Sequence, residues 1–246
     1  MELLGTIREI YRYPVKSMAG EAQRAATIGW HGLDGDRRFA FRRIGDTSGF
    51  PWLSASKLPA LVCHRAYYPP GAESGRLVRD VTPDGQDLAG DSAELRERIA
   101  ASCGGAVELM YLRQGIYDEA PLSLITVATL RRLSEASGVP FDVRRFRPNI
   151  LIETPDEQPF GEDRWVGRSL SCGGRPESAL IGVTMRDLRC AMVNLDPDTA
   201  RADPRLLKTT AQLNEVYAGV YGVPVRTGTV SVGEGLYALP KEASRE

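Results

Sequence analysis

The sequence feature that most constrains the fold is a long succession of short strand-like segments separated by turn residues. Up to residue 112 such segments cover 6–11, 38–42, 60–67, 76–81 and 107–112. In the second half they cover 149–153, 179–183 and 223–235. Many short strands with few helices favour closed or partly closed barrels, so we expect a mostly β fold with peripheral helices.

Three other segments have helical signatures. Residues 92–101 show helical spacing of apolar side chains and end before two glycines. Thr126 can cap a helix that ends at Gly138, and Pro204 opens a third helix. A second half begins near residue 115, and we expect the chain to divide there into two parts.

Composition excludes several classes of function. The chain has 246 residues, 31 Lys and Arg against 32 Asp and Glu, and a formal net charge of -1, so no global field would attract nucleic acid or an acidic membrane. It shows neither a secretory signal nor an apolar run of membrane-spanning length, and we expect a cytoplasmic protein. Only two histidines are present, which disfavours a His-rich zinc or non-haem iron site.

Cys190 is the first candidate for chemistry. It directly follows Arg189, and a neighbouring cation favours the thiolate form, which is a ligand for soft metals. A buried structural cysteine is the commoner explanation for a lone cysteine. The other cysteines, Cys63, Cys103 and Cys172, form no CxxC pair and no disulfide-rich spacing.

Three further segments concentrate groups that suit a phosphate or a pterin. Residues 145–150 place Arg147 and Asn149 at the start of an apolar strand, and residues 13–20 offer an ammonium beside a hydroxyl. A glycine-bracketed turn at 32–38 delivers Arg37 just before another strand. Taken alone, each segment is better explained as an ordinary surface turn.

The segments taken together carry a family resemblance. In this order and at these separations, "YPVKSMAG", "GLDGDRRF", "FRPNI" and "LRCAMVNLDPDT" resemble the MOSC family, the molybdenum cofactor sulfurase C-terminal domain. The resemblance implies an N-terminal β-barrel domain over 1–115 and a MOSC β-barrel over 116–246. Within the family the chain is most similar to the amidoxime-reducing proteins, the mitochondrial amidoxime-reducing component and its bacterial relatives.

The resemblance also implies a cofactor site. Cys190 matches the molybdenum-ligating cysteine of the family and would be the catalytic metal ligand. The positions that match residues holding the molybdenum-molybdopterin cofactor (Moco) are Lys16, Ser17, Arg37, Arg147, Asn149, Arg189 and Tyr221.

The chain departs from the amidoxime-reducing pattern at two places. Glu119 and Ala120 stand where relatives commonly have hydroxyl side chains, and a carboxylate there could alter substrate choice. Ser56 stands where an arginine is common. The chain also lacks the four-cysteine cluster of an iron-sulfur domain, so electrons would come from a separate ferredoxin, flavoprotein or cytochrome.

Three functional hypotheses follow. The first is a molybdoenzyme that reduces N-hydroxylated compounds such as amidoximes, hydroxylamines or N-hydroxylated bases, with the cofactor doing the redox chemistry. The second is a cofactor carrier or sulfur-transfer module that uses Cys190. The third is a degenerate double barrel that binds a small anion or nothing, because a fold does not fix a function.

Overall fold

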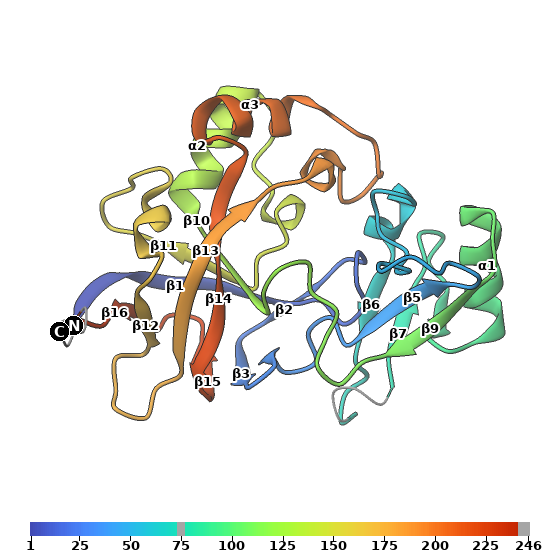
Figure 1. The fold of residues 1–246 in the computed structure, drawn as a ribbon, viewed down its shortest axis with the longest axis horizontal. Helices are drawn as coiled ribbons and strands as arrows, with labels where there is room; N and C mark the ends of the chain where they lie inside the picture. The colour runs from blue at the N-terminus through green and yellow to red at the C-terminus, as the bar shows by residue number, and fades with distance from the viewer. Residues whose placement is uncertain (73–76, 241–246) are drawn as a thin grey trace.

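The protein forms two bodies that lie side by side (Figure 1). The structure, a computed structural model, describes residues 1–72 and 77–240. One body is a barrel with two helices above it, and the other holds small sheets and one helix. The predicted fold class, mostly β with peripheral helices, is confirmed.

The larger body is a closed barrel of seven strands. Hydrogen-bonded neighbours run in the order β11-β10-β14-β13-β12-β16-β1, and β1 pairs with β11 to close the ring, while β2 extends the edge of β1. The strands are β1 (Glu2–Arg12), β2 (Glu21–Gln23), β10 (Leu122–Thr126), β11 (Ile150–Glu153), β12 (Ser169–Cys172), β13 (Leu180–Leu188), β14 (Tyr217–Arg226) and β16 (Gly235–Ala238).

The barrel closes through the first strand of the chain. Ile7 and Ile10 of β1 are both fully buried in the barrel core, although a regular strand would turn residues three apart to opposite faces. The pairing of β1 with β11 shifts its register between Ile7 and Glu9, which is the effect of a β-bulge. The first strand therefore supplies core to a barrel made mainly by the second half.

The smaller body is built from short antiparallel pairings. Its core includes Phe41, Leu61 and Ile99, all nearly fully buried. Its strands are β5 (Phe39–Arg43), β6 (Arg65–Tyr67), β7 (Arg79–Val81), β8 (Asp87–Ala89) and β9 (Val107–Tyr111).

A further small sheet packs against the barrel. Its hydrogen-bonded order is β15-β3-β4, and it joins a late strand to two early ones. Ile28, Leu33 and Val230 of this sheet belong to the barrel core. Its strands are β3 (Ala25–Gly29), β4 (Gly32–Leu33) and β15 (Gly228–Ser231).

The three predicted helices are confirmed. The helices are α1 (Ala93–Cys103), α2 (Val127–Ser137) and α3 (Arg205–Asn214). The hydroxyl of Thr126 accepts a hydrogen bond from the backbone N–H of Thr129 at 3.2 Å, and Gly138 ends α2 with a left-handed φ of 67°. None of the helices among the described residues is long and apolar enough to cross a membrane.

The predicted strand over 60–67 is wrong for its first part. Residues Pro59–Cys63 form a 3₁₀ helix, η1, and only Arg65–Tyr67 pair as a strand. Pro59 at the first helical turn favours that start, and a short apolar run does not by itself distinguish strand from helix. The predicted strand over 76–81 is observed from Arg79, and residue 76 lies outside the described residues.

Three further 3₁₀ helices lie in the second half: η2 (Val143–Arg145), η3 (Gly161–Trp165) and η4 (Ala191–Asn194). The division of the chain near residue 115 stays a prediction, because strands from its two sides pair with each other in both β1-β11 and β3-β15.

Candidate functional site

A cavity of about 370 Å³ is lined by residues from both halves of the chain. Loops after β1 and β4 contribute to it from the first half, and the end of β13 with the residues after η2 contributes from the second. It brings together seven of the eight predicted site residues: Lys16, Ser17, Arg37, Arg147, Arg189, Cys190 and Tyr221.

Lys16 carries a nearly buried charge into this cavity. Its side chain is 5% exposed, and Nζ donates to Oδ1 of Asp118 at 2.7 Å. Burial lowers the pKa of Lys16, while Asp118 opposes that shift. Phe50 places its ring centroid 5.3 Å from the same nitrogen, within the range of a cation–π contact.

The guanidinium groups of Arg37 and Arg147 both lie against the ring of Tyr13. The centroid distances are 4.7 Å for Arg37 and 4.3 Å for Arg147. Arg37 also pairs with buried Asp36 and donates to the backbone carbonyl of Arg147 at 3.1 Å. Two cations are thus fixed beside each other, with a shared aromatic ring and a neighbouring carboxylate limiting their repulsion.

Arg147 has a donor with no partner. Its Nη1 donates to the carbonyl of Met18, but Nη2 is buried and makes no hydrogen bond within the described residues. Burial, and then the charge of Arg37, lowers the pKa of Arg147 to about 10. A buried donor without an acceptor is costly, so an anionic acceptor bound in the cavity would be stabilised here.

Backbone strain gathers around the same cavity. Ser17, Arg37 and Arg147 all have left-handed φ values, of 67°, 49° and 52°, which non-glycine residues rarely adopt. Such conformations persist only where surrounding contacts hold them, and they cluster at ligand sites. Three strained residues on one cavity therefore support a binding role for it.

Arg189 braces the cavity wall. Its Nε donates to the carbonyl of Ala218 at 2.7 Å and its Nη1 to that of Phe146 at 2.8 Å. The third nitrogen, Nη2, lies 2.8 Å from Oδ2 of Asp187. Since most of its fork is occupied by protein groups, Arg189 holds the end of β13 in place.

Asp187 and Tyr13 also belong to the site, although no motif in the sequence assigns them a role. Asp187 is 1% exposed and accepts from the hydroxyl of Ser123 at 2.8 Å. Burial raises the pKa of Asp187 to about 6, and Arg189 opposes the shift. The available signal was its position in "MRDLRC", where strand alternation puts Asp187 and Arg189 on one face.

Cys190 reaches the cavity from the residue that precedes η4. Its side chain is exposed, and of the four cysteines it alone lines this cavity. Cys172 is buried in the barrel core, and Cys63 and Cys103 pack against the core of the smaller body. No group of three or more His, Cys, Asp or Glu side chains in the described ranges is arranged to hold a metal ion.

Asn149 is the predicted site residue that does not line the cavity. It is fully buried behind Arg37, with Oδ1 accepting from the backbone N–H of Ser123 at 3.1 Å and lying 3.5 Å from Nη1 of Arg37. Ser56 and Glu119, two of the residues that differ from the amidoxime-reducing pattern, line the cavity.

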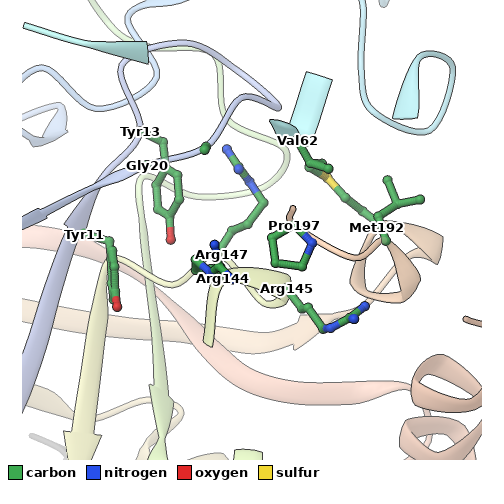
Figure 2. Close-up of a pocket in the computed structure, with 11 residues that line it drawn as sticks. Tyr11, Tyr13, Gly20, Val62, Arg144, Arg145, Arg147, Met192 and Pro197 are labelled. Carbon is green, nitrogen blue, oxygen red and sulfur yellow. The ribbon is translucent and has the colours of Figure 1, made fainter. Parts of the chain in front are cut away.

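A smaller pocket of about 30 Å³ adjoins the cavity, with Arg147 contributing to both. Figure 2 shows Tyr11, Tyr13 and Gly20 on one side of this pocket and Met192 and Pro197 on the other. Its volume admits a few waters at most, so the larger cavity is the candidate ligand site.

Comparison with known families agrees with this architecture. Residues 4–104 match the MOSC N-terminal beta barrel domain, and residues 111–237 match the MOSC domain. The chain belongs to the MOSC domain family. Members of this family are often enzymes that bind a molybdenum cofactor.

Among solved structures that are similar to this chain, one shows the same overall fold. The YuaD protein from Bacillus subtilis aligns over 94% of this chain and 93% of its own, with 13% identity and a TM-score of 0.50. YiiM from Geobacillus stearothermophilus aligns over 51% and 57%, with 18% identity and a TM-score of 0.39. YiiM from Escherichia coli aligns over 50% and 55%, with 15% identity and a TM-score of 0.37. No curated protein matches the chain in sequence.

Proposed function

We propose that this MOSC protein binds a molybdenum-pterin cofactor in the 370 Å³ cavity and reduces N-hydroxylated compounds. The observation that carries the proposal is that the exposed thiol of Cys190 and the unpartnered buried nitrogen of Arg147 share one cavity. The first group suits a soft metal and the second suits a phosphate or pterin edge.

The residues present fit such a cofactor. The cavity volume lies in the range of cofactor and small-molecule sites. Lys16, Arg37 and Arg147 would bind the phosphate and the pterin, and Cys190 would ligate the metal. Arg189 would keep the segment that carries Cys190 in position through its bonds to Ala218 and Phe146.

The reaction removes one oxygen atom. The N–O bond of the substrate breaks, two electrons and two protons are consumed, and the oxygen leaves as water. When bound, the cofactor would supply the two-electron redox chemistry. The electrons would come from a separate ferredoxin, flavoprotein or cytochrome, and Asp187 can hold a proton on its carboxyl group near pH 6.

An assay of benzamidoxime reduction by the protein, with reduced methyl viologen as the electron donor, tests this proposal. We expect wild-type protein, and Cys103→Ser, to form benzamidine, and Cys190→Ser to lose at least about 100-fold in rate because a hydroxyl is a poor soft-metal ligand. Cys103 is a suitable control because it lies in the smaller body and does not line the cavity. Full turnover by Cys190→Ser would contradict the proposed ligand.

The exposure of Cys190 also favours a second candidate, a cofactor carrier or sulfur-transfer module. In that role the thiolate of Cys190 would accept the outer sulfur of a partner's cysteine persulfide, whose S–S bond breaks and releases the partner's thiolate. Such a protein would contain bound cofactor yet show no turnover of N-hydroxylated substrates. The same assay, run on protein whose molybdenum content is known, separates the two.

A further inference from the structure

Glu119 differs from the other carboxylates of the cavity because it has no partner within the described residues. Three carboxylates line it, and two are engaged: Asp118 with Lys16, and Asp187 with Ser123 and Arg189. Glu119 is exposed and makes no hydrogen bond or ion pair within residues 1–72 and 77–240. It therefore offers a free negative charge to whatever enters.

Of the apolar side chains that line the cavity, Phe50 and Leu188 are the two that are exposed, as Glu119 is. Phe50 is 44% exposed and Leu188 is 60% exposed, so both face solvent as well as the cavity. We call Phe50, Glu119 and Leu188 the cavity mouth. An aromatic ring and an aliphatic side chain favour a flat apolar body, and a free carboxylate favours a cation.

The positive charges deeper in the cavity do not cancel this preference. Four of its five cations already face carboxylates, namely Lys16 with Asp118, Arg37 with Asp36, Arg145 with Asp196 and Arg189 with Asp187. The fifth, Arg147, faces no carboxylate within the described residues, and the proposed function assigns it, together with Lys16 and Arg37, to the anionic cofactor. With that anion bound, no unpaired cation of the cavity would repel a positively charged substrate.

We propose that the cavity mouth selects N-hydroxylated substrates that combine an aromatic body with a cationic group, and that Glu119 is the residue that recognises the cation. This inference rests on the proposed function and names the substrate class of the same site. A cationic surface on the electron-donor protein is the competing use of Glu119, but Glu119 lines the cavity itself, where a small molecule has access.

Three benzamidoximes of one shape test it: the neutral parent, a 4-aminomethyl cation and a 4-carboxy anion, each reduced by methyl viologen so that no protein donor is involved. We expect wild type to have its highest kcat/KM for the cation. Glu119→Gln should lower that value by about three- to fivefold and change the neutral substrate by less than about 1.5-fold, as for one solvent-exposed ion pair. Glu119→Lys should shift the preference toward the anion.

Glu135→Gln is the matched control, since Glu135 is an exposed glutamate of α2 that does not line the cavity. High salt should reduce the preference of wild type for the cationic substrate, because exposed charges are screened.

If wild type and Glu119→Gln both reduced all three compounds at similar rates, this inference would be overturned and the proposed function would stand. An equal fall for all three compounds in Glu119→Gln would also overturn the inference. No turnover of any compound by molybdenum-loaded wild type would overturn the proposed function itself.

Discussion

At the scale of single residues, the cavity depends on how Arg147 is held. Its guanidinium packs on Tyr13, one nitrogen bonds the carbonyl of Met18, and its backbone adopts a left-handed φ. Arg37 lies on the same ring and lowers the pKa of Arg147 together with burial. The protein thus keeps a buried cation with one donor that has no hydrogen-bond partner within the described residues. This arrangement lowers the stability of the empty protein, and it favours binding of an anion that can accept from that donor.

Replacing Arg147 should therefore reduce cofactor occupancy. Each charge-assisted hydrogen bond contributes roughly 1.5 to 3 kcal/mol, so Arg147→Ala should weaken retention by about tenfold or more. Arg147→Lys keeps the charge but loses the planar fork, and should fall between Arg147→Ala and wild type. The measurement is the molybdenum-to-protein ratio after dialysis.

Arg131→Ala serves as the control for Arg147, because Arg131 forms an exposed ion pair with Glu157 and does not line the cavity. An equal ratio in the three variants and wild type would show that Arg147 does not hold the cofactor.

The residues that form the cavity were partly predictable. Lys16, Arg37 and Cys190 could be found because each lies in a motif with a recognisable family pattern. Tyr13 lies in the motif of Lys16, and Asp187 directly precedes the motif of Cys190. Their roles depend on contacts with Arg147 and Ser123, which lie more than 60 positions away along the chain. Sequence spacing cannot show contacts that only the closed barrel creates.

At the scale of elements, the start of α2 is tied to η3 by a buried carboxylate. Glu162 of η3 is fully buried and accepts from the hydroxyls of Thr126 and Thr129, both at 2.9 Å. A carboxylate at a helix N-terminus is favoured by the helix dipole. Burial nevertheless raises the pKa of Glu162, and the hydrogen bonds from the two threonines oppose that shift.

The raised pKa of Glu162 predicts a pH-dependent stability. A carboxyl group whose pKa is higher in the folded state binds its proton more tightly there, so it stabilises the fold at low pH and loses this contribution as pH rises through the folded pKa. Glu162→Gln removes that titration and can still hydrogen-bond both threonines.

We therefore expect the free energy of unfolding of Glu162→Gln, relative to wild type, to increase with pH above the ordinary glutamate pKa of about 4.3. Urea unfolding of the cofactor-free protein between pH 4 and pH 8 gives this difference. The exposed variant Glu157→Gln should show no such trend, and a flat difference for Glu162→Gln would contradict the role assigned to its charge.

Local signals explain which elements were predictable. The caps of α2, Thr126 and Gly138, act within one helical turn, and both are observed as the sequence indicates. The segment over 60–67 carried an apolar run without such a signal at its centre, so the choice between strand and 3₁₀ helix depended on packing in the smaller body.

At the scale of the whole molecule, the central feature is a cavity assembled by both halves of the chain. The barrel is closed by β1, whose partners β11 and β16 lie more than 130 residues away, and no periodicity in the sequence encodes that pairing. The loop that leaves β1 carries Lys16 and Ser17 into the cavity. The strand that closes the barrel therefore also leads directly into two residues of the cavity.

The measurement that tests the account most directly is the molybdenum and pterin content of freshly purified protein from cells that make the cofactor. We expect about one molybdenum and one pterin per chain in wild type, and little molybdenum in Cys190→Ser, because the thiolate of Cys190 is the single protein ligand proposed. Wild-type protein that contains neither molybdenum nor pterin, from cells that load another molybdoenzyme fully, would contradict the account.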